Sequence, residues 1–63
     1  MYILTGTPGS QNDAFDTLEE VFGSSEFSAD DAIEALEEVL EMDTSEAQSA
    51  LKRLIRMNVL EEA

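Results

Sequence analysis

The chain carries only three positively charged side chains, and all of them lie within five residues, at Lys52, Arg53 and Arg56. Fifteen aspartates and glutamates are spread over the rest of the sequence, so the formal net charge is -12 at pH 7. Lysine and arginine bind phosphate oxygens and also reach the hydrogen-bond acceptors of guanine in the major groove of DNA. This cationic cluster, defined as these three residues, is therefore the first candidate for a functional site.

The sequence contains few other side chains suited to catalysis or metal binding. The sequence contains no histidine and no cysteine, which excludes Ser-His and Cys-His nucleophiles and makes a zinc site unexpected. Adjacent carboxylates such as Glu37 and Glu38 point about 100° apart on a helix, so they do not form an acid-base pair. The Gly6-Thr7-Pro8-Gly9-Ser10 segment lacks the lysine and the spacing of a P-loop. We expect no enzyme, no metal and no cofactor.

The acidity has two interpretations. Hydrophobic residues make up 43% of the chain and recur periodically, so this is not a disordered acidic tail. Folded domains rich in Asp and Glu and poor in Lys are typical of extreme halophiles, where the Debye length falls to about 3 Å at 1 M salt. On this interpretation the acidity is an adaptation to the solvent. The alternative is an acidic surface that binds a partner.

Length and hydropathy indicate one small domain, residues 1–63. A chain this short buries a small core and is expected to be marginally stable on its own. No apolar run approaches the roughly 20 residues needed to span a bilayer, and the N-terminal residues lack the pattern of a signal peptide. We therefore expect a cytoplasmic protein without membrane contact.

Three amphipathic helices are predicted from hydrophobic periodicity. The first begins between Ser10 and Asn12 and ends at Gly23, and the second is opened by Ser28. The third is opened by the capping-box sequence Asp43-Thr44-Ser45-Glu46 and ends near Met57 and Asn58. The apolar stripes expected to be buried comprise Ala14, Phe15, Leu18, Val21, Phe22, Ala32, Ile33, Leu36, Val39, Leu40, Ala47, Ala50, Leu51, Leu54 and Ile55.

Short strands are expected at both ends of the chain. Residues 1–5 contain Tyr2, Ile3 and Thr5, which are good strand formers, and residues 59–62 form a plausible second strand. Another short strand is expected to begin at Phe27, before the second helix.

This order of elements, ending in a third helix that runs into LKRLIRMNVLEE, resembles the winged helix-turn-helix superfamily over residues 13–62. In that superfamily the third helix commonly ends in two leucine-like positions, a short turn and an apolar strand. The matching residues here are Leu51, Leu54, Asn58, Val59 and Leu60. The resemblance implies a mostly α fold, with three helices in a winged-helix-like arrangement and a minimal β-sheet made by short terminal strands.

The chain also departs from that superfamily. A two-stranded wing usually follows the third helix, and glycine often stands where this chain has Asn58. Because the sequence ends at Ala63, only one wing strand is expected here. We expect Tyr2-Ile3-Leu4 to take the vacant place beside Val59-Leu60, which would tie down both ends of the chain and cover an exposed edge.

The third helix would be the recognition helix. At about 100° per residue, with Ala47 at the centre of the buried side, the cationic cluster falls on the outward side together with Ser45 and Ser49. The candidate DNA contacts are Ser45, Gln48, Ser49, Lys52, Arg53 and Arg56. The alternative is that the three cations complement the helix dipole or pair with carboxylates of the second helix. Asp43 and Glu46 at the start of the helix would oppose phosphates.

Two functions are weighed on this basis. The first is a small transcriptional regulator that binds double-stranded DNA. The second is an acidic adaptor that has the same fold and binds another protein. Three cations support only weak binding by a monomer, so we expect a homodimer. Aromatic residues and methionine are enriched at interfaces, which makes Tyr2, Phe27 and Met57 the candidate dimer or partner surface.

Overall fold

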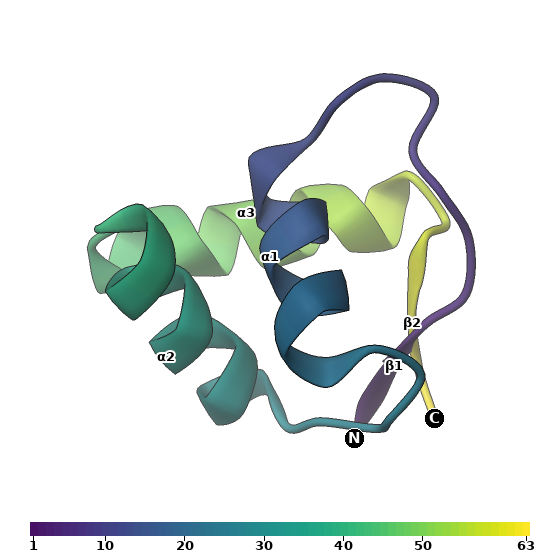
Figure 1. The fold of residues 1–63 in the computed structure, drawn as a ribbon, viewed down its shortest axis with the longest axis horizontal. Coiled ribbons are helices and arrows are strands. Elements are labelled where there is room, and N and C mark those ends of the chain that lie inside the picture. The colour runs from purple at the N-terminus through teal and green to yellow at the C-terminus, as the bar shows by residue number, and fades with distance from the viewer.

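The computed structural model describes residues 1–63, which form three helices and two short strands. In Figure 1, both chain ends lie close together at one end of the paired strands. The mostly α fold class predicted from the sequence is confirmed, and the arrangement is compatible with a winged-helix-like fold. The elements in chain order are β1 (Tyr2–Leu4), α1 (Asp13–Phe22), α2 (Ala29–Leu40), α3 (Thr44–Arg56) and β2 (Leu60–Glu62).

Each helix begins beside the capping residue that the sequence predicts. Asn12 and Ser28 each accept a hydrogen bond of 3.0 Å from the amide three residues later. Asp43 opens α3 with a complete capping box: its Oδ1 accepts the Glu46 amide at 2.8 Å, and Glu46 Oε1 accepts the Asp43 amide at 3.4 Å. These bonds satisfy amides that have no partner within the helix, so they fix where each helix starts.

The helix ends depend on left-handed backbone. Gly23, Glu41 and Asn58 have φ values of 59°, 55° and 60° and follow α1, α2 and α3 respectively. At the end of α3, the amides of Asn58 and Val59 bond back to carbonyls of the helix at 3.1 and 3.2 Å. These two hydrogen bonds form the Schellman motif, which turns the chain from α3 toward β2.

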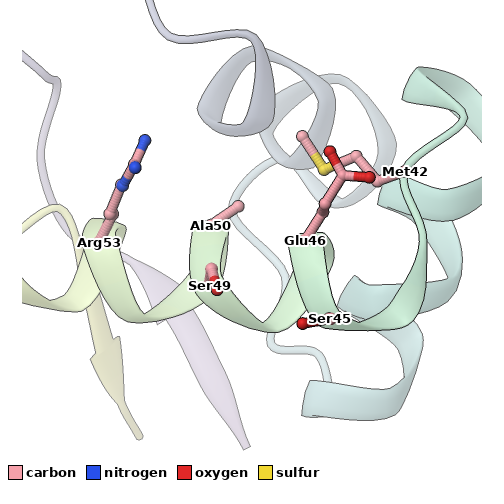
Figure 2. A pocket seen from close by; sticks show the side chains of 6 residues that line it. All are labelled: Met42, Ser45, Glu46, Ser49, Ala50 and Arg53. Carbon is pink, nitrogen blue, oxygen red and sulfur yellow. The ribbon is translucent and has the colours of Figure 1, made fainter.

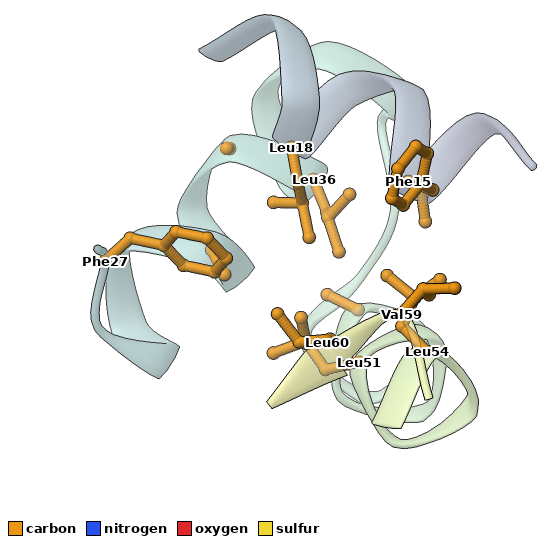
Figure 3. Close-up of a cluster of buried hydrophobic side chains, with 12 residues drawn as sticks. Phe15, Leu18, Phe27, Leu36, Leu51, Leu54, Val59 and Leu60 are labelled. Atoms are coloured by element: carbon orange, nitrogen blue, oxygen red, sulfur yellow. The ribbon is translucent and has the colours of Figure 1, made fainter. Parts of the chain in front are cut away.

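One apolar core joins the three helices to the sheet (Figure 3). Leu18, Leu36 and Leu54 are fully buried, one from each helix. Phe27 and Leu60, each 1% exposed, close the core on the side of the strands. The core therefore holds α3 through its inner side and leaves its outer side to solvent.

Three apolar residues predicted to be buried are exposed instead. Val21, Val39 and Ile55 are 50%, 58% and 41% exposed. A domain of this size has too little interior to cover the margins of every apolar stripe, so residues away from the stripe centre remain in solvent. Thr17 and Ala35, which the stripes did not include, are buried in α1 and α2.

The predicted pairing of the two terminal strands is confirmed. β1 and β2 are antiparallel, with Leu4 opposite Leu60 and Tyr2 opposite Glu62. On its other side β1 is joined to Phe27, but only through an isolated bridge with Tyr2, so the strand expected at Phe27 is reduced to one residue. β1 therefore lies between two segments that are far apart in the sequence.

Phe27 is a core residue, which contradicts its predicted place on a dimer or partner surface. Its ring stacks on that of Phe22 with centroids 4.5 Å apart, and its side chain is 1% exposed. The prediction that Phe27 belongs to a dimer or partner surface is therefore wrong. The bridge to Tyr2 holds its backbone at the edge of the sheet while its ring fills the core.

Candidate nucleic-acid interface on helix α3

The outer side of α3 is polar along its length. Its inner side is anchored in the core by Ala47, Leu51 and Leu54. This division between the two sides follows the helical period of the apolar residues. The predicted contact residues are all exposed to solvent: Ser45, Gln48, Ser49, Lys52, Arg53 and Arg56.

The cationic cluster wraps around this outer side and does not point in a single direction. Lys52 lies on the flank near the strands, where it lines a groove together with Tyr2. Arg53 lies on the flank near the start of α1, where it lines a hollow with Asp13. Successive helical residues point about 100° apart, and Arg56 falls between the other two in direction. The three cations thus cover an arc of about 100° on the outer side of α3.

A shallow hollow follows the Arg53 flank of α3. Figure 2 shows Glu46 and Arg53 extending from the same side of the helix, with Ser45 and Ser49 turned to another side. The carboxylate of Glu46 thus shares its flank with the guanidinium of Arg53. An anionic ligand on this flank would therefore meet a carboxylate as well as a cation. The lining residues are Met42, Ser45, Glu46, Ser49, Ala50 and Arg53.

No side-chain hydrogen bond ties the cationic cluster to the rest of the chain. Such bonds are confined to the helix caps and to a bond of 2.6 Å from Thr44 Oγ1 to Glu37 Oε2. One part of the alternative interpretation is that these cations pair with carboxylates of α2, but no hydrogen bond joins Lys52, Arg53 or Arg56 to such a carboxylate. Arg53 and Arg56 do lie in the last turn of α3, where positive charge complements the helix dipole.

The first turn of α3 has the opposite character. Asp43 and Glu46 are held there by the capping box, and Glu37 of α2 is held close by Thr44. These three carboxylates repel an anion near the start of the helix. The part of α3 suited to a polyanion therefore runs from Gln48 to Arg56.

The sequence did not predict the groove on the Lys52 flank. Ile33 and Ile55 line it, although both were assigned to buried stripes. Tyr2 is half-buried and lines the same groove, whereas Met57 is 41% exposed and lies outside it. Periodicity shows which side of a helix is apolar, but it does not show whether a neighbouring element covers that side.

None of the three helices combines the length and the hydrophobicity needed to cross a membrane. No group of three or more His, Cys, Asp or Glu side chains is placed to hold a metal ion. No protein-family model matches this chain, and neither a curated protein nor a solved structure matches it.

Proposed function

We propose that this chain is a small DNA-binding transcriptional regulator of the winged helix-turn-helix type, with α3 as its recognition helix and no enzymatic activity. The observation that carries the proposal is the cationic cluster. Lys52, Arg53 and Arg56 are all exposed on α3, and none of their side chains makes a hydrogen bond within the chain.

The outer side of α3 suits the major groove of B-DNA, which is about 12 Å wide and admits one helix. Ser49 is short, so the helix backbone can approach the bases closely there. Gln48 can pair with adenine, and Lys52 or Arg56 can reach guanine acceptors or phosphates. These contacts come from the middle and the end of α3, away from its acidic first turn.

The charge balance limits the affinity. Three cations release at most about three counterions, so the slope of log affinity against log salt is near -3 at most. The fifteen carboxylates oppose the approach of DNA. We therefore expect weak binding that falls steeply with salt, and we interpret the acidity itself as an adaptation to concentrated salt.

An NMR titration of the labelled chain with a DNA duplex tests the proposal. At about 50 mM KCl, shifts should be confined to residues 45–57, and they should shrink at about 200 mM KCl. Replacing Lys52, Arg53 and Arg56 with alanine should abolish the shifts without unfolding the chain, because all three side chains are exposed.

A matched control changes charge elsewhere. Glu34→Gln with Glu38→Gln removes two exposed carboxylates from α2 and leaves α3 intact. This variant should keep or slightly strengthen DNA binding. No shifts at low salt, or shifts spread evenly over α1 and α2, would contradict recognition by α3.

A second candidate function, an acidic adaptor, is favoured by a different face. Val21 and Val39 are 50% and 58% exposed on α1 and α2. Val21 lines a shallow hollow with Asp31, Glu34 and Glu38. Such a surface suits an apolar, positively charged segment of another protein. Val21→Asp with Val39→Asp should leave DNA affinity unchanged if α3 is the functional surface, and it should abolish partner binding if the adaptor function is correct.

A further inference from the structure

The largest hollow on the molecule lies between the start of α2, the middle of α3 and the two strands. Its volume is about 410 Å³, whereas the other three hollows measure 220–270 Å³. Most of its lining is apolar and includes Tyr2, Ile33 and Ile55. Asp30 lines it from α2 and Lys52 from α3. We call this feature the α2–α3 groove.

Ile55 shows that the α2–α3 groove is incompletely covered. This side chain is 41% exposed on the last turns of α3. Isoleucine is a poorer helix former than lysine, glutamine or glutamate, so local helix stability does not favour it at an exposed position. Together with Tyr2 and Ile33, it forms an apolar surface of the kind that marks a contact with another molecule.

We propose that the α2–α3 groove binds a second copy of this chain in a two-fold symmetric dimer. A two-fold axis that runs along the groove places Asp30 of one copy opposite Lys52 of the other, and the reverse pair forms by symmetry. The same operation brings Ile55 of each copy over the apolar lining of the partner groove. The groove is thus complementary to itself in both charge and hydrophobicity.

Charge also excludes most other ways for two copies to meet. With fifteen carboxylates and three cations, most isologous contacts would place carboxylates opposite carboxylates. The hollow between α1 and α2 is lined by Asp31, Glu34 and Glu38 with no cation. The hollows beside Arg53 combine both signs of charge, but they are smaller and less apolar. The α2–α3 groove alone combines both signs with a largely apolar lining.

A standard dimer interface buries about 800 Å² on each partner, which is roughly a fifth of the 4066 Å² surface of this chain.

The dimer has a distinctive dependence on salt. Two chains of net charge -12 repel each other at low ionic strength, and salt screens that repulsion while it strengthens apolar burial. Added salt should therefore promote the dimer, whereas it weakens binding to DNA.

Sedimentation equilibrium of the whole chain tests the dimer. Between about 0.1 M and about 2 M KCl, the average mass should rise from near 6.9 kDa toward twice that value. Ile55→Glu should return the chain to monomer in high salt. Met57→Glu is the matched control, because Met57 is equally exposed at 41% but lies outside the groove, and it should leave the dimer intact.

Charge reversal tests the reciprocal pair. Asp30→Lys or Lys52→Asp alone should weaken the dimer roughly tenfold, because each places like charges opposite each other twice in the dimer. The double variant restores opposite charges and should recover most of the affinity. Three results would overturn the proposal. The first is a monomer at both KCl concentrations, and the second is an equal loss of dimer in Ile55→Glu and Met57→Glu. The third is a double variant that dimerises more weakly than either single variant.

This dimer goes beyond the proposed function and does not depend on it, but the second copy competes with DNA for Lys52 and Gln48, which line the α2–α3 groove. Arg53 and Arg56 do not line the α2–α3 groove, so Arg53→Ala with Arg56→Ala should lose DNA binding and keep the dimer. Ile55→Glu should lose the dimer and keep the three cations on α3. Failure of one proposal is thereby distinguishable from failure of the other.

Discussion

Tyr2 and Phe27 exchange two backbone hydrogen bonds, 2.7 Å from the Tyr2 amide to the Phe27 carbonyl and 2.9 Å in the reverse direction. The opposite side of β1 pairs with β2. A strand of three residues thus lies between the segment that enters α2 and the segment that leaves α3. The relative position of the two helices that flank the α2–α3 groove depends on this strand.

Removing residues 1–6 should therefore destabilise the whole domain. The deletion removes the pairing with β2 and the bridge to Phe27, and it uncovers the buried side chain of Leu60. We expect the melting temperature to fall by roughly 10 °C or more, measured by circular dichroism. An unchanged melting temperature would show that β1 contributes no net stability.

The glycines after and before α1 should respond differently to alanine. Gly23 has φ of 59°, a backbone conformation that L side chains rarely adopt, so Gly23→Ala should cost about 1–3 kcal/mol of unfolding free energy. Gly9 has negative φ and no atom within 4 Å of an added Cβ. Gly9→Ala should change stability by less than about 0.5 kcal/mol in denaturant titrations. Equal losses of unfolding free energy in the two variants would contradict the explanation that the positive φ of Gly23 makes alanine costly there.

Neighbouring residues of α3 should differ in their importance for stability. Leu54 is fully buried, and Leu54→Ala should lower the free energy of unfolding by about 2–5 kcal/mol. Ile55 is 41% exposed, and Ile55→Ala should cost less than about 1 kcal/mol in a dilute monomer. Chemical denaturation of dilute samples at low salt, where the chain is monomeric, measures both values. A larger loss at Ile55 than at Leu54 would contradict the placement of α3 against the core.

Salt should stabilise the folded monomer. At net charge -12, carboxylates repel one another more strongly in the compact state than in the unfolded chain. The melting temperature of a dilute sample should rise by several degrees between about 0.1 M and about 2 M KCl. Glu34→Lys with Glu38→Lys adds two charge units at each position, changes the net charge from -12 to -8, and should reduce this dependence. An identical dependence in wild type and variant would argue against charge repulsion.

Helix boundaries were predictable because their causes are local. Asn12, Ser28 and Asp43 accept amides only three residues away, and Asn58 adopts a left-handed conformation within the turn that it forms. Hydrogen bonds over such short separations depend on few other residues. The polar outer side of α3 was predictable for the same reason, since helical periodicity follows from spacing along one segment.

The placement of residues at the margins of the helices was not predictable in this way. Val21 and Ile55 belong to apolar stripes, yet no neighbouring element covers them. Phe27 looked like a surface residue in a short link, yet its ring lies in the core against Phe22. Whether such a residue is covered depends on the distance and angle between elements that are remote in the sequence.

The sequence alone was enough to establish three helices, their N-terminal caps, and a single cationic cluster on the outer side of the third helix. Their causes are hydrogen bonds, backbone conformations and charges within a few residues of one another. The tertiary structure established that Lys52 shares a groove with Tyr2, Asp30, Ile33 and Ile55, whereas Arg53 lies beside the start of α1. These relationships follow from how β1 and the helices pack, because long-range packing brings together residues whose spacing in the sequence carries no such information.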